Sequence, residues 1–126
     1  MPKILVVDDS APMRTSMRTM LEAIGCEVVE AGDGSEGLKI LQENTDCQLA
    51  FVDVNMPIMD GLTMIQTVIV NEYALYPDIP FVVLTTEDNP QAISMAKVAG
   101  VKGWCIKPVK KEVVEKLVAH IIPKGG

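Results

Sequence analysis

The chain has 126 residues, 48% of them hydrophobic and 22% charged, and this size and balance predict a single globular domain over residues 1–126. Its formal net charge of −6 argues against sequence-independent binding of nucleic acid, which depends on lysine and arginine side chains that neutralise phosphates. The same charge argues against binding to an anionic membrane surface, and no apolar run reaches the length of a membrane span.

Short continuous apolar runs alternate along the chain with longer segments of helical period. Continuous runs, unlike runs that alternate apolar and polar residues, are typical of strands covered on both faces, as in a parallel sheet. The predicted strands are 4–7, 28–29 (inside the segment 26–31), 49–52, 79–84 and 104–106.

Five segments carry apolar residues at helical spacing. The first follows Ser10, a good N-cap, and is expected to stop at Gly25. The fourth opens with Asn89-Pro90, an N-cap followed by a proline at the first helical position, and stops at Gly100. The first predicted helix spans 11–24. Three more are predicted at 35–43, 62–72 and 110–121.

Strand and helix therefore alternate five times, which predicts an α/β fold with a doubly wound parallel sheet and right-handed crossovers. In such a sheet, ligands bind beyond the carboxyl ends of the strands, at the point where strand order reverses. If the order is 2-1-3-4-5, the reversal falls between the first and third strands, which end at Asp8-Asp9 and at Asp53. Sequence position and topology then indicate one pocket.

Three aspartates and one lysine follow the predicted strands, namely Asp8, Asp9, Asp53 and Lys107. Two carboxylates about 4 Å apart repel each other by about 4 kcal/mol at an effective dielectric constant of about 20. Such a cluster either takes up a proton or binds a cation, and a set of oxygen ligands alone favours Mg²⁺. Lys107 supplies a second positive charge, and Thr85 can present a hydroxyl beside Asp53.

These residue types indicate phosphoryl transfer to a carboxylate. Asp53 would be the nucleophile and would become an aspartyl phosphate. Mg²⁺ and Lys107 would neutralise charge that develops on the phosphoryl oxygens. Thr85 and Lys107 would then hydrogen-bond to the phosphorylated form.

The chain resembles a response-regulator receiver domain, and most closely the stand-alone CheY type of bacterial chemotaxis. The resemblance spans essentially all of the sequence and is carried by four stretches in the family's order: ILVVDDS, FVDVNMPIMDG, VVLTTE and GWCIKPV. It implies a flavodoxin-like (CheY-like) fold, with a five-stranded parallel sheet of order 2-1-3-4-5 and five helices.

The resemblance also implies a metal site. Asp9 and Asp53 would bind Mg²⁺ directly, and Asp8 would act mainly through water. The backbone carbonyl of Asn55 would complete the protein ligands. The peptide bond Lys107-Pro108 would be cis, which bonds before proline allow at small cost.

A switch is implied as well. Thr85 and Lys107 would each contact a phosphoryl oxygen, and Trp104 occupies the position of an aromatic residue that turns inward on activation. Trp104 is larger than the Tyr or Phe common at that position, so its inward turn needs more room. Asn55 and Glu87 occupy positions that tune the lifetime of the phosphoryl group.

The partners implied by the resemblance are proteins. A sensor histidine kinase would donate the phosphoryl group, and a phosphatase would be a further partner of the expected monomer. Output would pass through the face made by the fourth helix, fifth strand and fifth helix, roughly 89–99, 103–106 and 110–121. In the chemotaxis branch the target is the flagellar motor switch.

Three other functions share features with this sequence. A receiver acting in a phosphorelay or as a phosphate sink shares every site residue, so the motifs leave it open. A phosphatase of the haloacid-dehalogenase type needs a second Asp two residues after its nucleophile, where this chain has Asn55. A flavin carrier needs a phosphate-binding loop where Asp8 and Asp9 instead place negative charge. We therefore expect a signalling domain and not an enzyme.

The remaining sequence features concern location. Cys26, Cys47 and Cys105 form no CxxC pair and no metal-binding spacing, so we expect reduced, buried packing residues. Met1-Pro2-Lys3 leads directly into the first apolar run, without the pattern of a signal peptide. These features favour a cytoplasmic location.

Overall fold

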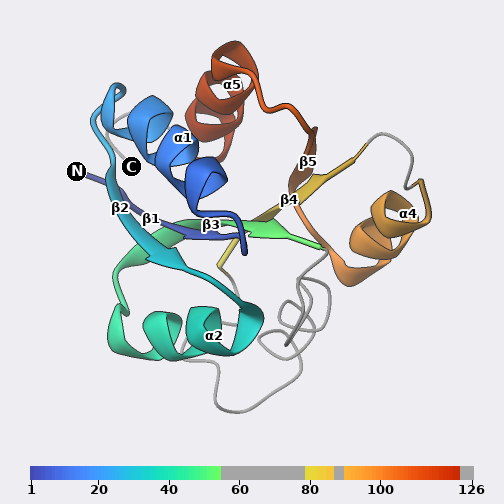
Figure 1. The fold of residues 1–126 in the computed structure, drawn as a ribbon, viewed down its shortest axis with the longest axis horizontal. Helices are drawn as coiled ribbons and strands as arrows, with labels where there is room; N and C mark the ends of the chain where they lie inside the picture. Colours follow the sequence, from blue (N-terminus) through green and yellow to red (C-terminus); the bar gives the residue numbers. More distant parts are fainter. Residues whose placement is uncertain (55–78, 87–89, 123–126) are drawn as a thin grey trace.

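A parallel β-sheet forms the centre of the protein in a computed structural model that describes residues 1–54, 79–86 and 90–122 (Figure 1). The sheet has five strands in the order β2-β1-β3-β4-β5, and every neighbouring pair is parallel. This confirms the predicted fold class and strand order. The strands are β1 Lys3–Val7, β2 Glu27–Ala31, β3 Cys47–Asp53, β4 Phe81–Thr85 and β5 Gly103–Ile106.

Helices cover both faces of this sheet. α1 and α5 lie together on one face, α2 lies on the other, and α4 packs beside β4 (Figure 1). Their bounds are α1 Ala11–Glu22, α2 Gly34–Glu43, α4 Pro90–Ala99 and α5 Lys111–Ile121. The helix predicted at 62–72 lies outside the described residues.

Two apolar cores, one on each face, explain why the strands read as continuous apolar runs. Successive side chains of a strand point to opposite faces. In β1, Leu5 and Val7 therefore belong to the core under α2, whereas Ile4 and Val6 belong to the core under α1 and α5. All four are fully buried. The second core also takes in the buried helical residues Met17, Leu21, Val114 and Val118.

Helix α1 begins where the sequence predicts and ends two residues earlier. The side chain of Ser10 caps it by accepting a hydrogen bond from the N–H of Met13 (3.3 Å). Its last turn tightens, because the N–H of Ile24 donates to the carbonyl of Leu21 (3.1 Å), three residues back. The predicted bounds 11–24 were therefore too long, and Ile24 stays 36% exposed. Gly25 follows with φ of +87°, as expected of a stop residue.

Two further predictions can be checked on the described residues. Cys26, Cys47 and Cys105 are free and buried, in agreement with the packing role predicted for them. Among the helices of residues 1–54, 79–86 and 90–122, none combines the length and the apolar character that a membrane crossing requires.

Candidate functional site

The predicted acidic residues lie at the carboxyl edge of the sheet. Asp8 follows directly after β1, and its N–H donates to the carbonyl of Ala31 at the end of β2 (3.1 Å). Asp53 is the last residue of β3 and pairs with Leu84 of β4. Asp8 is fully buried and Asp53 is only 3% exposed, although both are carboxylates. Buried charged groups need partners, so the surroundings of these two residues matter most.

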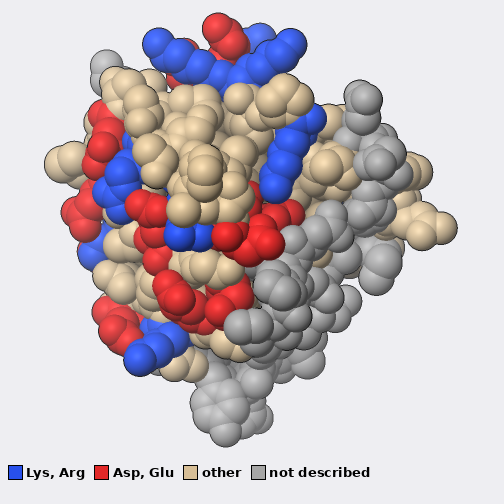
Figure 2. Space-filling model, viewed as in Figure 1, with Lys and Arg blue, Asp and Glu red and all other residues tan. Residues whose placement is uncertain are grey.

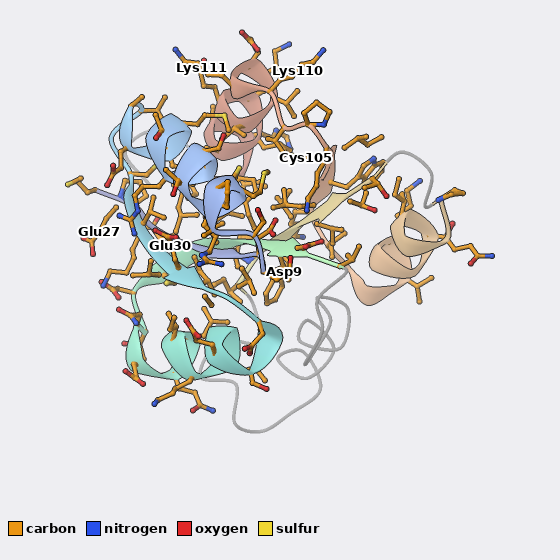
Figure 3. The ribbon with its side chains drawn as sticks, in the orientation of Figure 1. Asp9, Glu27, Glu30, Cys105, Lys110 and Lys111 are labelled. Carbon is orange, nitrogen blue, oxygen red and sulfur yellow. The ribbon has the colours of Figure 1, made fainter. Side chains whose placement is uncertain are left out.

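Asp8, Asp9 and Asp53 form a carboxylate cluster. Each offers one carboxylate oxygen, and these oxygens lie within 4.8 Å of one another. Asp9 is exposed and lies close to the arrowhead of β3 (Figure 3). The convergence follows from the topology, because β1 and β3 are adjacent parallel strands whose carboxyl ends share one edge.

Lys107 joins this cluster from the end of β5. Its Nζ lies 3.1 Å from Oδ2 of Asp8 and 3.4 Å from Oδ2 of Asp53. Its backbone N–H donates to the carbonyl of Thr85 (2.8 Å), which ties it to the end of β4. Burial alone would lower the pKa of Lys107, but the negative charges of Asp53 and Asp8 outweigh burial, so the net pKa is raised above its ordinary value. Lys107 therefore stays protonated at neutral pH.

The peptide bond that follows this lysine is cis. The bond Lys107-Pro108 is the only cis peptide among the described residues. This agrees with the isomer that the family resemblance implied for it.

The hydrogen bonding of the Asp8 carboxylate indicates whether the cluster fits a metal ion. Oδ1 accepts a hydrogen bond from the N–H of Ser10 (2.9 Å). Oδ2 is buried and accepts no hydrogen bond from the described residues, although Nζ of Lys107 lies 3.1 Å away in an ion pair. A buried charged oxygen without a hydrogen bond is costly. With two more carboxylates within 4.8 Å, it fits a hard divalent cation such as Mg²⁺.

Thr85 and Trp104 lie on the neighbouring strands. Thr85 is buried at the end of β4, and its hydroxyl donates weakly to the carbonyl of Thr86 (3.4 Å). Trp104 of β5 is 38% exposed, and Nζ of Lys97 from α4 lies 4.8 Å from the centre of its ring. The indole is thus at the surface, where a lysine stacked on it contributes about 0.5–1 kcal/mol.

Two predicted site residues cannot be placed. Asn55 was expected to supply a carbonyl ligand, and Asn55 and Glu87 were expected to tune phosphoryl lifetime. Both lie outside the described residues. The remaining predicted site residues are Asp8, Asp9, Asp53, Thr85, Trp104 and Lys107, and all of them lie on or directly after β1, β3, β4 and β5.

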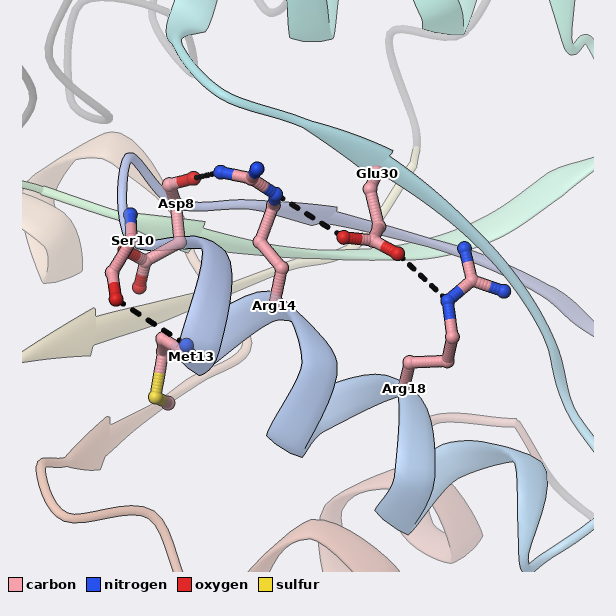
Figure 4. A network of polar contacts seen from close by, with 6 residues as sticks. All are labelled: Asp8, Ser10, Met13, Arg14, Arg18 and Glu30. Atoms are coloured by element: carbon pink, nitrogen blue, oxygen red, sulfur yellow. Dashed lines mark hydrogen bonds and ion pairs between the residues drawn. The ribbon is translucent and has the colours of Figure 1, made fainter.

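The sequence did not predict a role for Arg14 of α1, which contacts the site through the backbone of Asp8. Its Nη1 donates to the backbone carbonyl of Asp8 (2.6 Å), and its Nε donates to Oε1 of Glu30 on β2 (3.1 Å; Figure 4). The available signal was Glu30, a charged residue that follows two valines within β2. That signal does not identify its partner, which lies 16 residues earlier in the chain.

Comparisons with known proteins point to one family. The family described as response regulator receiver domain matches residues 4–119. A chemotaxis protein CheY homolog of Campylobacter jejuni is 33% identical over 125 residues, which cover 98% of this chain and 95% of that protein. CheY1 of Helicobacter pylori is 35% identical over 121 residues, covering 95% of this chain and 96% of CheY1. The structure of Vibrio cholerae chemotaxis protein CheY4 superposes with a TM-score of 0.86 at 33% identity, covering 97% of this chain and 99% of CheY4.

Proposed function

The chain belongs to the response regulator receiver domain family, and on that premise we propose that it is a phosphorylation-dependent switch whose acceptor is Asp53. A receiver domain is a signalling domain of two-component systems and not a conventional enzyme. One observation supports this acceptor above all. Asp53 is buried at the carboxyl end of β3, with Nζ of Lys107 only 3.4 Å from its Oδ2.

The proposed reaction is transfer of a phosphoryl group from a phosphohistidine of a sensor kinase, or from a small acyl phosphate. A carboxylate oxygen of Asp53 attacks phosphorus, and the bond between phosphorus and the donor breaks with its electron pair leaving on the donor. The product is an aspartyl phosphate. The ammonium of Lys107 neutralises negative charge on the phosphoryl oxygens and hydrogen-bonds to one of them. Thr85 donates its hydroxyl to another of those oxygens.

The proposed direct ligands of Mg²⁺ are the carboxylates of Asp9 and Asp53 and the backbone carbonyl of Asn55, with Asp8 acting mainly through water. The buried Oδ2 of Asp8, which lacks a hydrogen bond, supports this assignment. When bound, the ion would supply positive charge to the phosphoryl oxygens. The roles of the protein side chains are to gather the carboxylates and to keep Lys107 beside them.

The proposed output is a protein contact on the face formed by α4, β5 and α5. Lysine side chains gather over α5 (Figure 2), where Lys110 and Lys111 project outward (Figure 3). Phosphorylation at Asp53 would be read by Thr85 and passed to Trp104 of the adjoining strand β5. Asn55 and Glu87 would set how long the signal lasts.

The proposed target is the flagellar motor switch. Matches that cover nearly the whole length of chemotaxis proteins support this target. The alternative is a receiver that passes its phosphoryl group on in a phosphorelay or acts as a phosphate sink. A pull-down with phosphorylated and unphosphorylated protein separates them, because retention of a second kinase would favour the alternative over the motor switch.

Phosphorylation is tested by mass spectrometry after incubation with an acyl phosphate, with and without Mg²⁺. We expect the mass of one phosphoryl group to be added only with Mg²⁺, and Asp53→Asn to abolish it. Asp46→Asn is the matched control, because it removes an exposed carboxylate away from the cluster, one paired with Lys3. Equal phosphorylation of Asp53→Asn, or none of the wild type, would refute the acceptor.

A further inference from the structure

A network of charged side chains joins α1, β2 and the turn that carries the acidic pair. Nη1 of Arg14 donates to the backbone carbonyl of Asp8 (2.6 Å), and Nε of the same side chain donates to Oε1 of Glu30 (3.1 Å). Nε of Arg18 donates to the other oxygen of Glu30 (2.7 Å). Figure 4 shows the guanidinium of Arg14 between Asp8 and Glu30, with Arg18 beyond.

This network fixes the turn Asp8-Asp9-Ser10. Three backbone and side-chain groups of Asp8 are held at once: its N–H by the carbonyl of Ala31, its carbonyl by Arg14, and its Oδ1 by the N–H of Ser10. The carbonyl that Arg14 holds belongs to the peptide plane that leads into Asp9. Because that plane is rigid, holding it constrains the backbone from which the side chain of Asp9 projects.

Asp9 needs such support more than its neighbours do. It is exposed, and the described part of the chain provides no hydrogen bond or ion pair to its carboxylate. Asp8 and Asp53, in contrast, are buried and lie beside Lys107. The direction of the Asp9 side chain is therefore set mainly by its backbone.

Glu30 has a separate effect, because Arg14 is a cation close to a cluster of carboxylates. A guanidinium freed from Glu30 could turn toward those carboxylates and compete with a metal ion for them. The ion pair with Glu30 keeps it on the carbonyl of Asp8, and Arg18 holds Glu30 in turn. Charged hydrogen bonds of this kind are short and directional.

From these contacts we propose that Arg14 is a positioning residue for the metal site, held in place by Glu30. The inference rests on the proposed function only in taking the aspartate cluster as the Mg²⁺ site. Arg14 touches neither the metal nor the phosphoryl group; it acts through the Asp8-Asp9 peptide. Outer groups that orient metal ligands typically change metal affinity by about 10–100-fold when removed.

The sign of the effect makes the test decisive. By charge alone, removing an arginine near three carboxylates should tighten Mg²⁺ binding; by positioning, it should weaken it. We therefore compare Arg14→Gln with Arg18→Gln, which removes the same charge from the same helix and the same partner, Glu30, but has no contact with Asp8. Calorimetric titration with Mg²⁺ should show about tenfold weaker binding for Arg14→Gln and a change within about twofold for Arg18→Gln.

A second measurement needs no metal. The N–H of Ser10 donates to Oδ1 of Asp8, so its hydrogen exchange reports whether the turn is held. In EDTA we expect faster exchange at Ser10 for Arg14→Gln than for Arg18→Gln or the wild type. Arg14→Lys, which keeps one donor and the charge, should recover part of the Mg²⁺ affinity. If Arg14→Gln is too unstable to purify, Glu30→Gln replaces it and should weaken Mg²⁺ binding likewise.

The outcomes separate this inference from the proposed function. If Arg14→Gln binds Mg²⁺ as tightly as Arg18→Gln or more tightly, the positioning role is overturned, even where Asp53 is phosphorylated normally. If the wild type takes up no phosphoryl group while Arg14→Gln still weakens Mg²⁺ binding, the proposed function fails and the positioning role stands.

Discussion

Replacing Lys107 by methionine should destabilise the protein in the absence of divalent ions. Nζ lies 3.1 Å from Asp8 and 3.4 Å from Asp53, and at an effective dielectric constant of about 20 each pair is worth about 5 kcal/mol before desolvation is subtracted. Removing one partner of a buried ion pair typically costs about 3–5 kcal/mol, because an uncompensated charge remains. Lys107 keeps 26% of its side chain exposed, so we expect the lower end, about 3 kcal/mol.

Urea denaturation followed by far-ultraviolet circular dichroism measures this loss, in EDTA and again in excess Mg²⁺. A ligand that binds only the native state stabilises it by about 2.7 kcal/mol at about one hundred times its dissociation constant. Mg²⁺ should therefore recover most of the deficit of Lys107→Met, because the ion replaces the lost positive charge. Lys110→Met is the control: Lys110 is exposed, and its loss should change stability by no more than about 0.5 kcal/mol.

Three results would refute this reasoning. If Lys107→Met is as stable in EDTA as the wild type, the ion pairs contribute nothing net to folding. If Mg²⁺ widens the difference between Lys107→Met and the wild type, the metal and the lysine do not compensate the same carboxylates. Equal losses for Lys107→Met and Lys110→Met would mean that the effect is not specific to the site.

Three further changes test other parts of the structure. Asp9→Ala should weaken Mg²⁺ binding about tenfold or more, as measured by calorimetry, because it removes a proposed ligand. Unchanged affinity would show that the proposed metal site is wrong. Ser10→Ala should lower the free energy of unfolding by about 1 kcal/mol, because the N–H of Met13 loses its cap. Burial raises the pKa of the Cys105 thiol from 9.0 to about 11, so its stabilising contribution is complete below pH 9 and is lost as pH rises toward 11. Between pH 9 and pH 11 the free energy of unfolding of Cys105→Ala should therefore fall less than that of the wild type, with a difference of about 1 kcal/mol at pH 10. Parallel curves of stability against pH for the two proteins would contradict this.

The fold and the carboxylate cluster could be predicted because both depend on pattern and not on side-chain detail. Apolar runs covered on both faces predict parallel strands, and parallel strands bring their carboxyl ends to one edge whatever the loops do. Asp8, Asp9 and Asp53 therefore had to meet once the order 2-1-3-4-5 held. Helix ends were less predictable: Ile24 continues the apolar spacing of α1 but lies beyond its last turn.

The contacts around the cluster could not be predicted, because they depend on which residues face each other across elements. Arg14 reaches Glu30 only because β2 lies beside β1 in a register that pairs Val6 with Glu30. Lys97 reaches Trp104 only through the placement of α4 beside the sheet. A long charged side chain has many rotamers, and sequence alone does not say which partner selects one of them.

The charges of the described site account for the proposed pairing of the lysine with a metal ion. Asp8, Asp9 and Asp53 carry three negative charges and Lys107 one positive charge, which leaves a net charge of −2. A phosphoryl donor is itself an anion and would approach this edge against that charge. A divalent cation on the aspartates brings the site to neutrality without displacing Lys107, whose Nζ already lies beside Asp8 and Asp53. Asp9 is the one carboxylate of the three without an ion pair among the described residues. In the proposed site its placement would decide how well the cation is held, and we propose that this placement depends on Arg14, which holds the carbonyl of Asp8.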